Sequence, residues 1–155
     1  MSSINIAVSE SVAVQSAQKW DRTKNNLEQY RALMALASAK DIERGTGGGQ
    51  MVAKKAATQI LENGFLGALA FAIEPKKGGG FKNPGHQSVF EAVRKYLVGI
   101  SALKKSPTTE EMMLEVSSRS ADGLRYITSE TVAYMNYLRR FARPDKDEKS
   151  EEAGA

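Results

Sequence analysis

Residues 124–141 read LRYITSETVAYMNYLRRF, and this stretch decides the fold class. Mostly apolar side chains recur in it at alternating steps of three and four residues. They are Leu124, Ile127, Thr131, Tyr134, Leu138 and Phe141. That spacing places them on one face of an α-helix. Pro144 follows, and proline cannot continue a helix. The stretch therefore predicts a long amphipathic helix that packs one face against the rest of the molecule.

A stripe of the same kind lies nearer the start of the chain. It consists of Leu27, Tyr30, Met34 and Ala37. Asn25 and Glu28 resemble a capping box at the start of this helix, with Asn in place of Ser or Thr. The glycine-rich run at residues 45–49 ends it. We therefore predict a helix between these two signals.

The segment from Met51 to Glu74 predicts a further helix, which Pro75 ends. From Ile60 onward the segment is apolar almost all round, which indicates burial on several sides. Asn63-Gly64 lies inside it, and such a pair usually marks a turn. Because the periodicity continues past the pair, we expect a tolerated glycine or a kink that allows close helix contact.

Two more helices are predicted after a loop at residues 75–85, which carries three lysines: Lys76, Lys77 and Lys82. The first is outlined by its apolar residues Val89, Val93, Tyr96, Ile100 and Leu103. The second begins with Ser106 as N-cap and Pro107 as first helical residue, and it runs to about Ser117.

No alternation typical of β-strands appears anywhere in the sequence. The chain is therefore predicted to be all-α, a compact bundle of five to six helices. We expect residues 1–22 to form an N-terminal extension, flexible to about Ser11 and with a further short helix at Val12–Trp20. Residues 23–143 form the helical domain, and residues 144–155 form an acidic, disordered tail.

The residues that carry most enzyme chemistry are scarce. The chain has no cysteine, which excludes disulfides, thiol catalysis and cysteine-based zinc sites. His86 is the single histidine, and we expect it to be solvated. The glycine clusters at 45–49 and 78–80 lack the Lys-Ser/Thr ending of a phosphate-binding loop. Acidic residues at 110–115 complement a helix dipole. We therefore predict that the protein is not an enzyme and holds no cofactor or metal.

The sequence also carries no sign of export or membrane insertion. Residues 1–10 have neither the basic start nor the apolar core of a signal peptide. The longest apolar run, at residues 65–73, is far shorter than the roughly 20 residues that a bilayer requires. We therefore expect a cytoplasmic protein with no membrane partner.

Charge is distributed unevenly along the chain. The net charge is +4, but residues 144–155 hold five acids against two lysines, so the preceding residues carry +7. Residues 76–105 alone carry seven basic residues against Glu91. On the last helix, polar and basic residues share a face roughly opposite the apolar stripe. They are Arg125, Ser129, Asn136, Arg140 and Arg143, with Arg139 beside them.

These basic residues allow two interpretations. Arginines near the end of a helix can simply complement its dipole and its free carbonyls. Alternatively, lysines and arginines on one surface bind phosphates without reading bases, which favours sequence-independent binding of a nucleic acid. Few aromatic residues are interleaved with the basic ones, so base stacking is not the expected mode.

Three stretches together resemble the small subunit of the Cmr complex, the type III-B CRISPR effector. Residues 27–32 are similar to that family's opening Leu-Glu-Gln-x-Arg-Ala motif. Lys55, the Asn-Gly-Phe at 63–65 and the Leu-Ala-Phe at 69–71 are similar to its central segment. Residues 138–142, Leu-Arg-Arg-Phe-Ala, resemble its closing motif. The resemblance spans roughly residues 23 to 143.

This resemblance implies a helical bundle that stacks in several copies along the effector complex. Its implied partners are guide RNA and target RNA through backbone contacts, the Cmr backbone subunits, the large polymerase-cyclase subunit and further copies of the chain. Cleavage and cyclic-nucleotide synthesis belong to the other subunits of such complexes. The implied role is antiviral defence through RNA binding without catalysis.

Carried onto this sequence, the motifs make Arg31 and Lys55 the first candidates for an RNA-facing surface. Arg139 and Arg140 come next. Lys54, Arg94 and Lys95 are added from charge alone. For Arg31 and Lys55 the alternative is an ion pair within the bundle. The apolar motif residues and Gly64 are expected to serve packing or stacking between subunits.

Three other functions stay open at this point. The chain could be the corresponding small subunit of the related Csm complex, or a generic helical adaptor whose partner is a protein. A helical enzyme with an unrecognised site is the third alternative. The alternatives differ in what accompanies the native protein: guide RNA with Cmr subunits, guide RNA with Csm subunits, or protein alone.

Overall fold

The computed structural model describes residues 19–46, 48–104 and 106–145. Five helices lie in these ranges: α2 (Leu27–Thr46), α3 (Gln50–Ala72), α4 (Pro84–Gly99), α5 (Thr109–Ser117) and α6 (Ala121–Phe141). The described residues contain no β-strand, so the predicted all-α bundle is confirmed. The N-terminal extension before residue 19 and the tail after residue 145 lie outside the described residues. Lys19 and Trp20, the end of the short helix expected there, are not helical.

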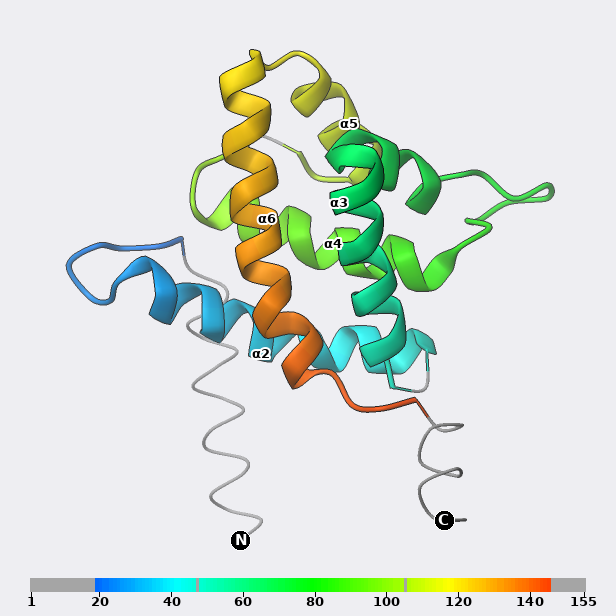
Figure 1. Ribbon diagram of the computed structural model, residues 1–155, viewed down its shortest axis with the longest axis horizontal. Coiled ribbons are helices and arrows are strands. Elements are labelled where there is room, and N and C mark those ends of the chain that lie inside the picture. Colours follow the sequence, from blue (N-terminus) through cyan, green and yellow to red (C-terminus); the bar gives the residue numbers. More distant parts are fainter. Residues whose placement is uncertain (1–18, 47, 105, 146–155) are drawn as a thin grey trace, which may run out of the picture.

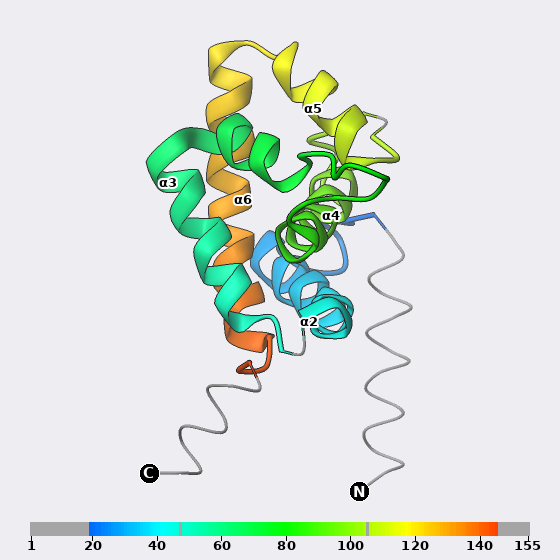
Figure 2. The ribbon, with the colours of Figure 1, turned by 90° about the vertical axis from the view of Figure 1, so that its right-hand side faces the viewer.

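The helices form two layers with a cap. α3 and α6 lie side by side and run in opposite directions, as Figures 1 and 2 both show. α2 and α4 form the second layer, and α5 covers the end where α6 begins. No helix in the described ranges is both long enough and apolar enough to cross a membrane.

The core lies where α2, α3, α4 and α6 meet. The rings of Tyr96 and Tyr134 stack at its centre, with centroids 4.7 Å apart and planes within 8°. Phe65 and Phe90 make an edge-to-face contact at 5.7 Å. All four side chains are buried. Aromatic pairs in these geometries stabilise a core beyond the area that they bury.

The stripe on α6 packs into this core as its spacing predicts. Four of its six members are buried: Ile127, Thr131, Tyr134 and Leu138. The first and last members, Leu124 and Phe141, are less buried because they lie near the ends of the helix. Burial of one helical face is what positions the opposite, polar face of α6 toward solvent.

Two helix starts differ from the sequence expectation. At α2 the backbone N–H of Gln29 donates to Asn26 Oδ1 and the N–H of Asn26 donates to Gln29 Oε1, both at 2.8 Å. This reciprocal capping box lies one residue later than the predicted Asn25–Glu28 pair. The Glu28 carboxylate instead accepts a hydrogen bond from Tyr137 Oη at 2.7 Å.

The start of α5 also differs from its predicted position. Thr108, not Ser106, caps the helix, and its Oγ1 accepts the backbone N–H of Glu111 at 3.1 Å. Ser106 is buried and donates its hydroxyl to Glu115 Oε1 at 2.9 Å. The competing carboxylate therefore draws Ser106 away from the capping role.

Asn63-Gly64 does produce a kink in α3. Gly64 has φ 82° and ψ 166°, a conformation essentially restricted to glycine. The expected close helix contact is wrong, because a Cβ at Gly64 would meet nothing within 4 Å. The close approach occurs instead at Gly99, where a Cβ would overlap the hydroxyl of Tyr30.

Gly64→Ala should therefore lower the free energy of unfolding by about 1–3 kcal/mol, through backbone strain alone. Gly67→Ala, three residues along the same helix, is the matched control. Gly67 has no positive φ, and a Cβ added there would lie 3.3 Å from Asn63 Cβ, so alanine meets a tight contact but no backbone strain and should cost less than at Gly64. Urea unfolding of both variants tests this. Equal losses of unfolding free energy in the two variants would contradict the backbone conformation that kinks α3 at Gly64.

Candidate nucleic-acid interface

The seven predicted RNA-facing cations fall into two groups. In the first group a carboxylate within the bundle pairs with the side chain. Its members are Arg31, Arg94 and Lys95. In the second group the side chain has no ion-pair partner among the described residues. Its members are Lys54, Lys55, Arg139 and Arg140.

Arg31 lies on α2 and joins a three-residue network. Its Nη2 lies 2.9 Å from Glu130 Oε2, and its Nε donates to Tyr96 Oη at 3.2 Å. Tyr96 Oη in turn donates to Glu130 Oε2 at 2.8 Å. Burial acts to lower the pKa of Arg31, but these hydrogen bonds outweigh it and raise that pKa. The ion pair offered as the alternative for Arg31 is therefore present.

Arg94 and Lys95 on α4 are also engaged. Arg94 pairs with Glu91 one turn away and donates an Nη1 hydrogen bond to the carbonyl of Ser106 at 2.8 Å. Lys95 Nζ lies 3.9 Å from Asp41 Oδ2, and both side chains remain about half exposed. Arg94 thus fixes the segment before α5. RNA contact by Arg94 and Lys95 stays a prediction.

The unpaired cations come from α3 and α6, the helices that lie side by side in the first layer. Lys54 and Lys55 lie on α3, and both are exposed. Arg139 and Arg140 lie on the last turn of α6, where Arg140 is exposed and Arg139 is half-buried. Because α3 and α6 are antiparallel neighbours, the start of α3 lies beside the end of α6 (Figure 1). The fold thereby places Lys54 and Arg139 along one hollow.

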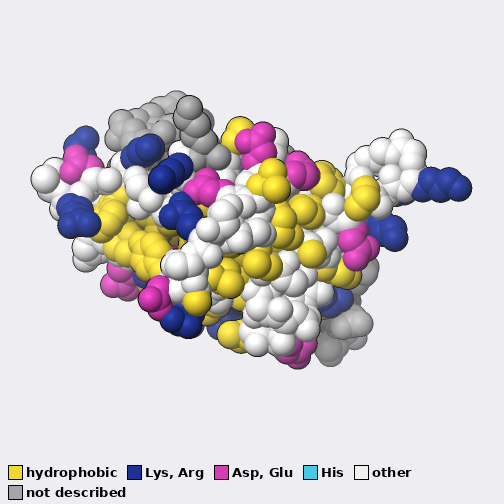
Figure 3. Space-filling model, turned by 90° about the horizontal axis from the view of Figure 1, so that it is seen from above, with side chains coloured by type: hydrophobic (Ala, Val, Ile, Leu, Met, Phe, Trp, Pro, Cys, Tyr) yellow, Lys and Arg dark blue, Asp and Glu magenta, His cyan; other side chains and the backbone are white. Residues whose placement is uncertain are grey.

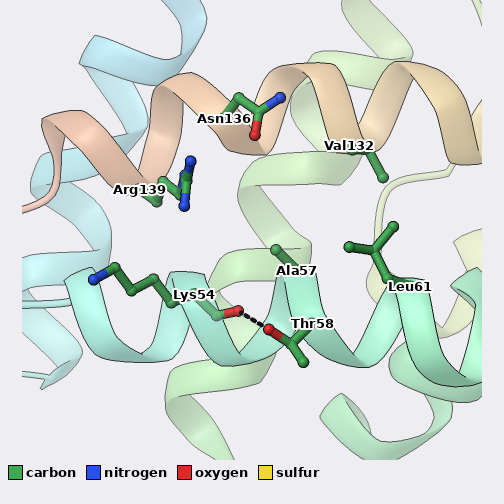
Figure 4. Close-up of a pocket in the computed structure, with 7 residues that line it drawn as sticks. All are labelled: Lys54, Ala57, Thr58, Leu61, Val132, Asn136 and Arg139. Carbon is green, nitrogen blue, oxygen red and sulfur yellow. Dashed lines mark hydrogen bonds between the residues drawn. The ribbon is translucent and has the colours of Figure 1, made fainter.

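That hollow, which we call the α3–α6 hollow, has a volume of about 360 Å³. It is lined by Lys54, Ala57, Thr58, Leu61, Val132, Asn136 and Arg139, which Figure 4 shows. The two cations lie toward one end of it, and Leu61 and Val132 lie toward the other. Arg139 Nε is buried and has no hydrogen-bond partner among the described residues. Buried polar atoms normally have one.

A second hollow shares Lys54 and Thr58 with the first and has a volume of about 430 Å³. We call it the His86 hollow, and it is lined by Lys54, Lys55, Thr58, Gln59, Phe71 and His86. His86 is not simply solvated, as the sequence had suggested, because its ring is half-buried and packs edge-on against Phe71 at 5.0 Å. Burial, and then the charge of Lys55, lowers its pKa, which favours the neutral imidazole.

The loop between α3 and α4 adds two further cations to the surface. Lys76 and Lys77 are exposed in this loop, and Lys82 pairs with Glu74 at 3.8 Å. Figure 3 shows the loop projecting from the body with basic side chains at its end. The loop follows directly from the helix that carries the His86 hollow.

Sequence reasoning missed Thr58 and Gln59, and it placed Asn136 on the polar face of the last helix without naming it as a site residue. Helical spacing could have identified them, because Thr58 and Gln59 lie four residues after Lys54 and Lys55 and so share their face of the helix. Asn136 likewise lies three residues before Arg139. The described ranges contain no group of three or more His, Cys, Asp or Glu that could hold a metal ion.

The chain was compared with known proteins. Residues 27–144 match the family model described as CRISPR-associated protein (Cas_Cmr5), which covers well over half of the chain. No curated protein and no solved structure matches. The match spans the three motif stretches, so the resemblance that they indicated is confirmed. This chain belongs to the Cas_Cmr5 family of CRISPR-associated proteins and is a Cmr-type CRISPR subunit.

Proposed function

We propose that the chain is a non-catalytic small subunit of a type III-B CRISPR effector ribonucleoprotein in the cytoplasm. Several copies stack along the complex beside its larger subunits, and each offers a basic surface to guide and target RNA. One observation carries the RNA role: Lys54, Lys55 and Arg139 have no carboxylate partner among the described residues and gather around two adjoining hollows.

The physical reason lies in how cations bind nucleic acids. A lysine or arginine without a carboxylate partner can displace counterions from phosphates, which favours binding at low salt. Because phosphate contacts carry no sequence information, such a surface accepts any guide sequence. A subunit shared by all guides requires this property.

Lys54→Ala combined with Lys55→Ala should weaken binding of a fluorescent oligoribonucleotide by about tenfold at 0.1 M salt. The slope of log affinity against log salt should fall by up to about 0.7 for each lost phosphate contact. Fluorescence anisotropy between 50 and 200 mM salt measures both quantities.

The matched control is Lys24→Ala combined with Lys104→Ala. This pair removes the same charge from two exposed lysines that line neither hollow. It should change affinity much less. Equal losses in the two double variants would show that net charge alone acts, and would contradict a localised interface.

Purification of the tagged chain from its native cells tests the assembly. We expect guide RNA and type III-B subunits to copurify at low salt. Csm subunits in their place would assign the chain to the related type III-A complex. Loss of both RNA and CRISPR proteins would contradict the proposal.

A protein-binding adaptor is the second candidate. Leu61 on α3 and Leu114 on α5 are 73% and 71% exposed, which is high for large apolar side chains. Contacts with other proteins could cover them. An RNA-free complex that persists at high salt would favour this candidate.

A further inference from the structure

Two polar side chains of the His86 hollow lack hydrogen-bond partners, those of Gln59 and His86. Gln59 Oε1 and His86 Nδ1 are buried without a hydrogen bond. Neither side chain bonds to any other residue that the structure describes. Leaving such groups unpaired is unfavourable, so a bound group that pairs with them gains affinity.

A primary amide and a neutral imidazole together offer hydrogen-bond donors and acceptors. Rotation of the Gln59 amide about its last bond exchanges its oxygen with its nitrogen, so either can face the hollow. Every nucleobase carries donors and acceptors along its edge, which suits such a pair. Because the Gln59 amide can present either its oxygen or its nitrogen, it can hydrogen-bond to any of the nucleobases.

The aromatic wall of the hollow points to the same ligand. Phe71 lines the hollow, is half-buried, and packs its ring edge-on against His86. Bases stack on aromatic side chains with little dependence on sequence. At the rim, Lys54 and Lys55 are exposed and could hold the phosphates on either side of such a base. The volume of about 430 Å³ falls within the usual range for small-ligand sites.

We propose that the His86 hollow receives one unpaired nucleobase of an RNA strand whose phosphates lie on Lys54 and Lys55. The inference rests on the proposed RNA-binding function and adds base contact to backbone contact. It also differs from the sequence analysis, in which base stacking is not the expected mode.

Three ten-unit probes separate base binding from phosphate binding: oligoadenylate, oligouridylate and an abasic oligoribonucleotide with equal charge. The full chain, prepared without a histidine tag, should bind both base-containing probes at least about fivefold more tightly than the abasic one. His86 is the single histidine of the chain, so its imidazole Cε1–H gives one NMR signal. That signal should shift with the base-containing probes and stay in place with the abasic probe.

Gln59→Ala should weaken binding of oligoadenylate about two- to tenfold and leave the abasic probe unchanged. Asn63→Ala is the matched control, because it removes an exposed amide one turn further along α3 and outside the hollow. It should change neither affinity.

The outcomes distinguish the two proposals. Equal affinity for all three probes, or an unmoved His86 signal with bound oligoadenylate, would overturn base binding and leave the phosphate interface standing. Equal losses of both probes in Gln59→Ala would also overturn it, since base contact would not explain them. No binding of any probe, in the chain or in its assembled complex, would overturn both proposals.

Discussion

Leu69→Ala is expected to lower the free energy of unfolding by about 2–5 kcal/mol, and Leu61→Ala by less than about 0.5 kcal/mol. Both leucines lie on α3, eight residues apart, but Leu69 is fully buried and Leu61 is 73% exposed. Removing Leu69 loses transfer free energy and leaves a cavity in the core, whereas Leu61 is already in water.

Urea unfolding measures both losses, and Leu61→Ala is the built-in control because the chemical change is identical. For a chain of this size, Leu69→Ala should lower the Tm by roughly 2–4 °C for each kcal/mol. Similar losses at the two positions would mean that the second half of α3 does not pack as described. The comparison therefore tests the helix that carries Lys54, Lys55 and both hollows.

The fold class was predictable because it depends on periodicity within single helices. The stripe on α6 needs no knowledge of its partners, since spacing alone places Ile127, Tyr134 and Leu138 on one face. The same holds for the stripe of α2. The five helices predicted between residues 23 and 143 are all present, and what remained to be learned was how they pack.

Helix starts were less predictable because they depend on competing hydrogen bonds. Ser106 has the right side chain and the right following residues for an N-cap, yet Glu115 takes its hydroxyl. Glu115 also accepts the backbone N–H of Lys104 at 2.8 Å. Local sequence patterns do not reveal hydrogen bonds to a carboxylate nine to eleven residues further along the chain.

The close packing of helices also depends on tertiary structure. Asn63-Gly64 was expected to allow a close helix contact, but glycine is needed at position 64 for its positive φ instead. Gly99, near the end of α4, is where Tyr30 of α2 approaches the backbone. Nothing in the sequence near Gly99 indicates that a tyrosine 69 positions earlier lies against it.

The division of the candidate site into paired and unpaired cations shows the same limit. Arg31 and Glu130 are 99 residues apart in sequence, and Lys95 pairs with Asp41 across the bundle. Composition indicates a basic surface but cannot say which charges the fold neutralises. Lys54 and Lys55 keep their charges available because no acidic side chain is placed beside them among the described residues.

Glu130→Ala is expected to lower the free energy of unfolding by about 2–4 kcal/mol. The side chains of Arg31 and Glu130 are only 16% and 14% exposed. Removing the carboxylate leaves a largely buried guanidinium without its counter-charge, and it leaves the hydroxyl of Tyr96 without its acceptor. Asp122→Ala, on the same helix, removes a pair with Arg125 that is mostly exposed, and it should cost no more than about 1 kcal/mol.

A double-mutant cycle separates the pair from its surroundings. Arg31→Ala with Glu130→Ala should cost less than the sum of the single variants, by about 1–3 kcal/mol, because the second change removes a charge that the first left unpaired. Urea unfolding at constant pH measures all four proteins. Additive losses would show that Arg31 and Glu130 do not interact in solution. Arg31 would then be available to RNA, as the family motif first suggested, and the interface would extend from α3 and α6 onto α2.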